Sequence, residues 1–456
     1  MKTFFILAFL IISTVTVAQK PAEVVSGPML GPVEFRTANV WIELKEGIDD
    51  ASLLYWPKGK TKASAKRIFQ KKQVTSFPNI YKWAVPQLEP GSSYEYNIVA
   101  GKEAKVIGNG EFATQSLWQY RTDPPDFSFI TGSCAYFNEP GYDRPGTPYG
   151  KDSSIFLSMA KETDASFMLW LGDNWYTREV DYYSEWGLNY RPSRDRSMAV
   201  MQPLLKAMPH YAIWDDHDYG PNNADKSYVL KEASRKVFMD YWSNPSYGQD
   251  GNGIFTRFTF NDVDFFLLDD RWFRSNDEMV DSIEGKPNAA KKMFGDQQME
   301  WLKNALLQSQ SNTMIKFRII ATGTQVLNDF STKDCFIHYQ SEFNEMMDFL
   351  NAHKIDGLVF LTGDRHLSSI IKRNRINNYS LYDITASALT AGLSRRAPGE
   401  ATNPNMVAHV DDSNSYSKIS FTGKGTSRTM TVKFINTKGE QLVEWSIALQ
   451  DLIHQK

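Results

Sequence analysis

Four short apolar runs in this sequence each lead into residues that carry a thiol, a carboxylate or an imidazole. The most informative run is residues 167–171, Phe-Met-Leu-Trp-Leu, which Gly172 ends and Asp173 follows directly. Runs of this kind are typical of buried strands, and open α/β sheets bind ligands where the carboxyl ends of such strands meet. The sequence therefore predicts a functional site at one sheet edge. The runs with the residues that follow them are 127–133 with Cys134; 167–171 with Asp173 and Tyr176; 211–214 with Asp215, Asp216, His217 and Asp218; and 357–361 with Asp364 and His366.

Helical patterns separate these runs, so we expect an α/β domain over residues 126–450. Because strands joined by crossing helices place their carboxyl ends on the same edge of a sheet, the four exits are expected to converge. A hairpin is expected over residues 255–268, around Asn261-Asp262. Helices are expected near 153–161, 178–208, 224–242, 296–309 and 340–353, with further strands at 315–321, 380–384, 418–421, 429–434 and 442–447.

Residues 20–118 have a different pattern, with short alternating strands and frequent turns. Leu88 begins a Leu-x-Pro-Gly-x-x-Tyr-x-Tyr segment that places Tyr94 and Tyr96 on one face of a strand. This segment resembles the late strands of fibronectin type III sandwiches. We expect a small all-β sandwich of fibronectin or immunoglobulin type, joined to the larger domain by a linker at Pro124-Pro125.

The first 18 residues have the pattern of a secretory signal peptide. Lys2 is followed by an apolar stretch over residues 4–12, and Thr16-Val17-Ala18 is a small-residue cleavage site. The apolar stretch is well short of the roughly 18 residues that a membrane-spanning helix needs. The sequence predicts an exported protein, periplasmic or extracellular, without an integral membrane segment.

Charge and cysteine content exclude several classes of protein. The chain has 456 residues and a formal net charge of −3, which gives no electrostatic basis for binding a nucleic-acid scaffold. The short basic cluster of Arg191, Arg194 and Arg196 is expected on the solvated surface. Only two cysteines are present, so the protein is not a disulfide scaffold. Cys134 and Cys335 form one disulfide, remain two buried thiols, or leave Cys134 free to bind a metal.

The acidic residues at the strand exits favour a bound cation. Several carboxylates at one buried edge repel one another and are costly to desolvate, and cations relieve that cost. Carboxylates suit hard cations such as Ca²⁺, whereas a thiolate with a phenolate suits Fe³⁺. Asp173, at the centre of the series, is the best candidate for a carboxylate shared between cations.

The motif series is similar to that of a known enzyme family. Gly-Ser-Cys134, Leu-Gly-Asp173-Asn-Trp-Tyr176, Trp-Asp-Asp216-His217-Asp and Leu-Thr-Gly-Asp364-Arg-His366 occur in the order found in the alkaline phosphatase D (PhoD-type) family. That family belongs to the calcineurin-like metallophosphoesterase superfamily. The resemblance covers roughly residues 25–445, including the β-rich N-terminal part.

This resemblance implies the fold, the cofactors and the site. The fold would be α/β, a metallophosphoesterase β-sandwich flanked by helices and preceded by the small all-β sandwich. The cofactors would be Fe³⁺, bound through cysteine and tyrosine, beside Ca²⁺, with other divalent cations as the alternative. Ordinary metallophosphoesterases carry histidine or asparagine at several of these positions, and this chain carries Cys134, Asp216 and Asp364 there. The implied metal ligands are Cys134, Asp173, Tyr176, Asp216, Asn223, Asp364 and His366, and the implied catalytic residues are His217 and Arg365.

The expected activity is hydrolysis of a phosphomonoester or phosphodiester outside the cytoplasm. One alternative is a phosphodiesterase or phospholipase-type enzyme acting on lipid head groups or nucleotides. Another is a non-catalytic adhesion module that binds metal. Several residues also have structural interpretations: the run beginning at Asp215 could cap a helix, Asn222 could replace Asn223 as a ligand, and Arg365 could point into solvent. The sequence leaves the oligomeric state open.

Overall fold

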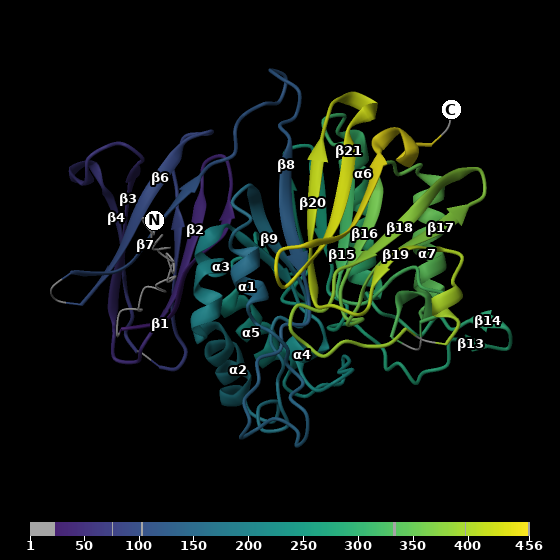
Figure 1. The fold of residues 1–456 in the computed structure, drawn as a ribbon, viewed down its shortest axis with the longest axis horizontal. Helices are drawn as coiled ribbons and strands as arrows, with labels where there is room; N and C mark the ends of the chain where they lie inside the picture. The colour runs from purple at the N-terminus through teal and green to yellow at the C-terminus, as the bar shows by residue number, and fades with distance from the viewer. Residues whose placement is uncertain (1–22, 75, 102–103, 332–333, 397, 455–456) are drawn as a thin grey trace, which may run out of the picture.

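A computed structural model describes residues 23–454 except 75, 102–103, 332–333 and 397. The proposed signal peptide therefore lies outside the described residues. Two stacked sheets with flanking helices form the larger part, and a smaller pair of sheets formed by the N-terminal residues packs beside it (Figure 1). This agrees with the expected α/β β-sandwich preceded by an all-β sandwich.

The first large sheet has the order β10-β9-β8-β20-β21-β22 among the described residues. β8, β9 and β10 run parallel, whereas β20 pairs antiparallel with β8. Three of the four strands predicted to lead into the site are therefore adjacent and end at the same edge. The strands are β10 (His210–Ile213), β9 (Ala165–Leu171), β8 (Phe127–Gly132), β20 (Ser415–Thr422), β21 (Thr429–Asn436) and β22 (Gln441–Ala448).

The second large sheet has the order β11-β12-β15-β16-β18-β17-β19. β12, β15, β16 and β18 run parallel, so the fourth predicted strand, β16, ends among them. The hairpin of β11 and β12 was expected, whereas β17 and β19 were not. The strands are β11 (Thr256–Phe260), β12 (Val263–Leu267), β15 (Phe317–Thr322), β16 (Leu358–Thr362), β18 (Asn378–Thr385), β17 (Ser368–Arg375) and β19 (Met406–Val410), with a separate pair β13 (Ser282–Ile283) and β14 (Lys286–Pro287).

Aromatic side chains join the two large sheets face to face. Phe129 of β8 meets Phe265 of β12 edge-on, with ring centroids 5.4 Å apart, and Phe317 of β15 meets Phe421 of β20 at 4.9 Å. Such pairs combine a large buried apolar area with a preferred ring geometry. The interior between the sheets is thus a close-packed core, and the chemistry is confined to its edge.

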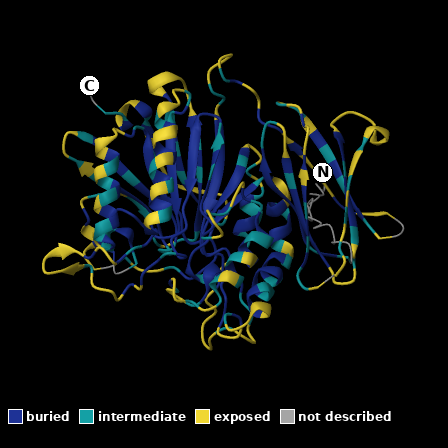
Figure 2. Ribbon diagram, turned by 180° about the vertical axis from the view of Figure 1, so that it is seen from behind, coloured by how far each residue is buried: buried dark blue, intermediate teal, exposed yellow. Residues whose placement is uncertain are grey.

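Helices cover the outer faces of both large sheets. α6 and α7 lie over the second sheet with their buried sides inward and an exposed stripe outward (Figure 2). Within the described residues, no helix combines the length and apolarity needed to cross a bilayer. The helices are α1 (Ile155–Met159), α2 (Glu185–Ser197), α3 (Gln202–Ala207), α4 (Asp216–Tyr219), α5 (Lys231–Tyr241), α6 (Gly295–Ser311) and α7 (Gln340–Ala352).

The N-terminal sandwich has its own apolar core and rests on the helical layer of the first sheet. The Ser26 hydroxyl donates to the Arg196 carbonyl at 3.0 Å, and the Trp41 indole donates to the Asp240 carbonyl at 2.9 Å. These contacts fix the sandwich against α2 and α5. Its sheets contain β1 (Val24–Val33), β2 (Ala38–Leu44) and β5 (Asn79–Val85), and β4 (Lys66–Lys71), β3 (Asp50–Pro57), β6 (Ser93–Ala100) and β7 (Lys105–Ala113).

The basic cluster of α2 is mostly buried, so the prediction that it is solvated surface was wrong for Arg191 and Arg196. Arg191 donates to Asp181 at 2.8 Å and to Glu139 at 2.7 Å. Arg196 lies over the Trp242 ring at 3.9 Å. Both arginines find partners in distant segments, which a local sequence pattern does not reveal.

His210, at the start of β10, is held in its neutral form. Its Nδ1 accepts from the Trp170 indole N–H at 3.0 Å, and its Nε2 donates to the Leu204 carbonyl at 3.1 Å. An indole N–H only donates and a carbonyl only accepts, so this network has room for one ring hydrogen. Burial lowers the pKa of His210 to about 3. His210 therefore has a structural role in this sheet.

Candidate metal centre

The four predicted strand exits meet at one edge of the stacked sheets, the lower edge in Figure 1. Two groups of side chains there place ligand atoms within 4.8 Å of one another: Cys134 with Asp173 and His366, and Asp173 with Asp216 and His217. Asp173 belongs to both groups. The sequence placed these residues on separate runs, and the fold brings them together.

Cys134 is at the centre of the first group. Its Sγ lies 3.7 Å from Asp173 Oδ2, and the Ser387 hydroxyl donates to it at 3.2 Å. Tyr176 lies next to this first group, because its hydroxyl is 3.0 Å from His366 Nε2. Cys134 and Cys335 are both free and buried, so the disulfide alternative was wrong.

The loop after β10 supplies the second group. The His217 backbone N–H lies 2.9 Å from Asp216 Oδ1 and 3.2 Å from Asp173 Oδ1. The Asn223 backbone N–H donates to Asp216 Oδ2 at 2.6 Å, which brings Asn223 to the site, and its side-chain oxygen accepts from Asn222 at 2.7 Å. Asp216, Asn223 and Asp364 all line one cavity at this edge of the sheets.

The preceding residue, Asp215, has a structural role. It caps α4, accepting from the Asp218 N–H while the Asp218 side chain accepts from the Asp215 N–H at 3.0 Å. The helix-cap interpretation of this run is therefore correct for Asp215, while its neighbours Asp216 and His217 face the site.

Five of the seven proposed ligands have a left-handed backbone. The φ angles are +62° at Cys134, +50° at Asp173, +56° at Asn223, +64° at Asp364 and +53° at His366. L-residues adopt this region rarely and at an energetic cost, and such residues concentrate where the surrounding structure requires them for function. Except at Asn223, which follows α4, these residues form the sharp turns after β8, β9 and β16 that carry the side chains to the site.

The electrostatics of the cluster favour a cation. Burial, and then the neighbouring Asp216 and Cys134, raise the pKa of Asp173 well above its usual value. Burial raises the pKa of Cys134 to about 11, and burial with Asp334 raises the pKa of Asp364 to about 7. A cation reverses these shifts because it stabilises thiolate and carboxylate together.

The orientation of His366 also fits a metal. Its Nδ1 lies 2.7 Å from the Gly392 carbonyl, which can only accept, so Nδ1 carries the hydrogen. Nε2 therefore keeps its lone pair and faces Tyr176. Metal-binding histidines are commonly fixed by such a bond from the other ring nitrogen. The donor set of thiol, phenol, imidazole and carboxylates thus fits the expected cations.

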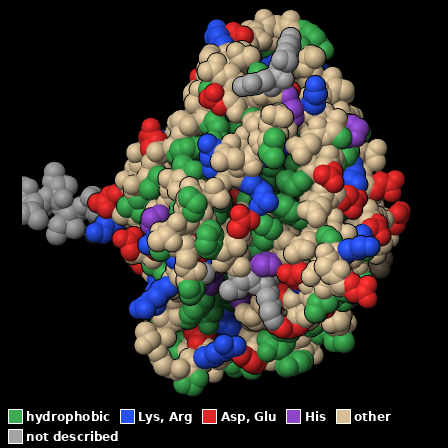
Figure 3. Space-filling view, turned by 90° about the vertical axis from the view of Figure 1, so that its right-hand side faces the viewer, with side chains coloured by type: hydrophobic (Ala, Val, Ile, Leu, Met, Phe, Trp, Pro, Cys, Tyr) green, Lys and Arg blue, Asp and Glu red, His purple; other side chains and the backbone are tan. Residues whose placement is uncertain are grey.

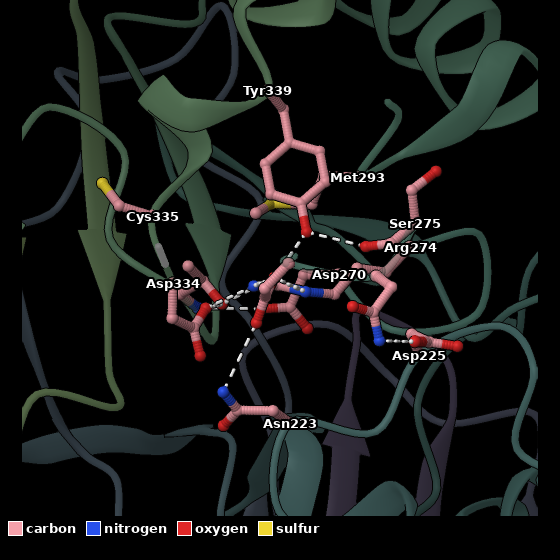
Figure 4. Close-up of polar contacts among 12 residues, drawn as sticks. Asn223, Asp225, Asp270, Arg274, Ser275, Met293, Asp334, Cys335 and Tyr339 are labelled. Carbon is pink, nitrogen blue, oxygen red and sulfur yellow. Dashed lines mark hydrogen bonds and ion pairs between the residues drawn. The ribbon is translucent and has the colours of Figure 1, made fainter. Parts of the chain in front are cut away.

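A buried ion network supports the strand exits from behind. Arg271 pairs with Asp215, and both side chains are fully buried. Arg274 bridges Asp334 and Asp277, and the Tyr339 hydroxyl donates to Asp277 at 2.7 Å (Figure 4). The network holds Asp334 at the wall of the site cavity.

The two predicted catalytic residues have different surroundings. The His217 ring lies 4.2 Å from the Tyr176 ring between centroids, and its Nδ1 has no hydrogen-bond partner among the described residues. The Arg365 guanidinium donates to Gln325 at 2.6 Å and to the buried Glu400 at 2.9 Å. Arg365 is thus occupied by protein partners rather than pointing into solvent, and its catalytic role stays a prediction.

The cavity over the cluster, about 510 Å³, has lining residues that the sequence motifs did not indicate. Asp334 and Tyr149 follow no recognisable strand exit, and Tyr149 reaches the site with its hydroxyl oxygen 2.9 Å from His366 Nδ1. Arg395 lies exposed at the opening, and Arg396 pairs with Asp411 at 2.7 Å. These residues lie on loops, so only the tertiary structure reveals them.

The face seen in Figure 3 mixes basic and acidic side chains, with Lys and Arg lying among Asp and Glu. This distribution agrees with the small net charge of the chain.

Comparisons with solved structures show the same fold. A structure described as "Structure of PhoD" superimposes with a TM-score of 0.77 at 15% identity, covering 95% of this chain and 92% of that one. A purple acid phosphatase, PPD1 from yellow lupin (Lupinus luteus) seeds, gives a TM-score of 0.64 at 11% identity, covering 93% and 74%. At these identities the likeness shows the fold alone.

Comparisons of sequence show the family. Alkaline phosphatase D of Bacillus subtilis (strain 168) is 25% identical over 325 residues, which are 62% of this chain. The match spans about half of that relative, 52% of its length. The family model for PhoD-like phosphatases matches residues 129–433, and this span contains all four strand exits. The chain belongs to the PhoD-like phosphatase family.

Proposed function

We propose that this protein is an exported, metal-dependent phosphoester hydrolase of the alkaline phosphatase D type. The observation that carries the proposal is the convergence of four strand exits, from two sheets, on two ligand groups that share Asp173. Membership of the PhoD-like phosphatase family supports the same activity. The substrate is a phosphomonoester or a phosphodiester.

The ligand chemistry divides the site between two kinds of cation. Cys134, Tyr176 and His366 suit Fe³⁺, which favours thiolate, phenolate and imidazole. Asp216, Asn223 and Asp364 supply the oxygen ligands that Ca²⁺ prefers. Asp173 lies between them and is assigned to both.

Bound cations of this kind lower the pKa of a coordinated water and neutralise charge on the phosphoryl oxygens. The residues of the chain orient the ester and handle its proton. His217 lines the cavity over the cluster and lies with Asp173 and Asp216, and we assign it protonation of the leaving oxygen. Arg395, exposed at the opening, attracts the anionic ester. Arg365, held by Glu400, keeps the turn of Asp364 and His366 in place.

The test is hydrolysis of p-nitrophenyl phosphate and bis-p-nitrophenyl phosphate by the full chain, supplied with iron and calcium. We expect activity that a chelator abolishes and the two cations restore, and a loss of about 100-fold or more in His217→Gln, the lower range for a general acid. The two esters also decide between monoesterase and diesterase. If neither is cleaved although both cations are bound, the hydrolase proposal fails and a metal-binding module remains.

Export and domain organisation are proposals that rest on the sequence of residues 1–18 and on the separate apolar core of the N-terminal sandwich. We expect signal cleavage after Ala18 and two folding domains, residues 20–118 and 126–450. N-terminal sequencing of the mature protein from fractionated cells checks the first. Limited proteolysis checks the second, with early cleavage expected between residues 119 and 125. An uncleaved protein in the cytoplasmic fraction would contradict export.

A further inference from the structure

A second cavity, of about 430 Å³, opens beside the metal centre. Tyr149, His217 and Asn222 line both this cavity and the one above the proposed ligands. The two cavities are therefore neighbours, and His217, to which we assign protonation of the leaving oxygen, lies in the wall between them. An ester with its phosphorus at the metal centre has its alcohol side within reach of the second cavity.

Tyrosine side chains dominate the second cavity, which we call the tyrosine pocket. Tyr136 and Tyr149 meet edge-on with ring centroids 4.9 Å apart, and Tyr136 lies 5.1 Å from Tyr176. Tyr142 and Tyr149 keep 52% and 41% of their surface exposed, so their rings have area available for contact. The tyrosines of the pocket are Tyr136, Tyr142, Tyr149, Tyr176 and Tyr182.

The loop that carries Tyr142 and Tyr149 is fastened at its base. The Asn138 side chain donates to the Gly150 carbonyl at 2.8 Å and accepts from the Gly150 N–H at 2.9 Å. Within the loop, Asp143 accepts from the Tyr136 hydroxyl at 2.8 Å. The pocket wall is thus formed before any ligand arrives, which lowers the entropic cost of binding.

The charged groups of the pocket are paired with each other. Arg178 meets Asp143 at 2.9 Å, and Arg144 meets Glu179 at 2.8 Å. Each guanidinium has a carboxylate partner, so these four residues add no net charge for an ionic ligand. Aromatic faces in a neutral setting select planar, uncharged rings, which stack on them independently of the ring's detailed structure.

We propose that the tyrosine pocket binds a planar aromatic ring, such as a nucleobase or an aryl group, on the alcohol side of the phosphoester. This inference deepens the proposed function and rests on it. In the reaction, the oxygen of water bonds to phosphorus, the bond between phosphorus and the alcohol oxygen breaks, and that oxygen takes a proton. The ring-bearing alcohol is then held in the pocket. The enzyme accordingly favours nucleoside or aryl phosphates over esters of aliphatic alcohols.

The experiment compares two esters of primary alcohols, adenosine 5′-monophosphate and glycerol 3-phosphate, so that leaving-group chemistry is matched and the ring differs. The readout is the ratio of the two kcat/KM values. Tyr142→Ala and Tyr182→Ala should lower this ratio at least about fivefold, the low end of the loss when an aromatic stacking partner is removed. Tyr142→Phe, which keeps the ring, should restore it, and Tyr120→Ala, 87% exposed and outside the pocket, is the control.

A binding measurement separates this inference from the hydrolase proposal. Adenosine, which carries the ring without phosphate, should bind the metal-depleted full chain in calorimetry, and more weakly in Tyr142→Ala. If no phosphoester is cleaved, the hydrolase proposal fails. Adenosine binding alone then shows whether the tyrosine pocket binds an aromatic ring. If the ratio of the two kcat/KM values is unchanged in both alanine variants, the proposed ring binding in the tyrosine pocket is wrong. It is also wrong if adenosine fails to bind, or binds Tyr142→Ala as well as the wild-type protein.

Discussion

Gly363, between β16 and Asp364, is the position where one added methyl group should damage the site most specifically. A Cβ there would lie 2.5 Å from the Leu171 carbonyl oxygen and 2.8 Å from Ser133 Cβ. Ordinary contact begins at 3.4 Å, so the β16 exit must move by about 0.9 Å from the β9 exit. Leu171 and Ser133 come just before the proposed ligands Asp173 and Cys134. Neither residue can move unless its strand moves with it. Gly363→Ala should therefore separate Asp364 from Asp173.

We expect Gly363→Ala to cost about 1–3 kcal/mol of stability, as overpacking does, and to weaken metal binding about 10–100-fold, as loss of supporting contacts does. The assay is metal content by mass spectrometry beside thermal unfolding. Gly141→Ala is the matched control, because a Cβ there meets nothing within 4 Å. If Gly363→Ala keeps the metal content and stability of the control, the strand exits are not held as closely as the structure indicates.

Three further predictions concern residues around the site. His210 has a folded pKa of about 3, below the unfolded value of 6.5, so its stabilising contribution is complete above pH 6.5 and is lost as pH falls towards 3, by up to about 1.4 kcal/mol per pH unit. His210→Asn should flatten the decline of stability between pH 7 and pH 5 in denaturant titrations, and equal slopes would contradict the assignment. Arg271→Gln leaves Asp215 buried without its partner and should cost about 3–5 kcal/mol in urea unfolding; a loss below 1 kcal/mol would show that the pair is not desolvated. Arg395→Ala should raise KM for anionic esters several-fold at low salt, with the difference shrinking at high salt; a salt-independent effect would exclude electrostatic attraction.

The sequence predicted the elements that lead into the site because each apolar run ends abruptly. Gly172 ends β9 at a point where an added Cβ would lie 2.6 Å from Asp215 Cβ. The glycine that marks the strand end in the sequence is therefore also required by close packing. By contrast, β17 and β19 were missed because their residues are mixed, and β19 pairs with β17 across a long intervening segment. The helix expected over 224–242 begins only at Lys231, after a turn in which Asp225 accepts from the Ser227 N–H.

Side-chain roles were less predictable than strand exits. Nothing local distinguishes Asp215 from Asp216, yet one is buried against Arg271 and the other faces the cavity. Arg191 was expected in solvent and is fully buried, where it pairs with Glu139 of a distant segment. Tyr149 reaches His366 from a loop with no motif of its own. In each case the partner is distant in sequence.

The most direct test of a metal centre built around Asp173 is the metal content of the full chain and of Asp173→Ala. Among the described residues, Asp173 is the carboxylate that both ligand groups share. We expect the wild-type protein, reconstituted with iron and calcium and then dialysed, to retain both metals, and Asp173→Ala to lose both while staying folded. A wild-type protein that retains neither metal, or an Asp173→Ala variant that keeps both at full occupancy, would contradict this expectation.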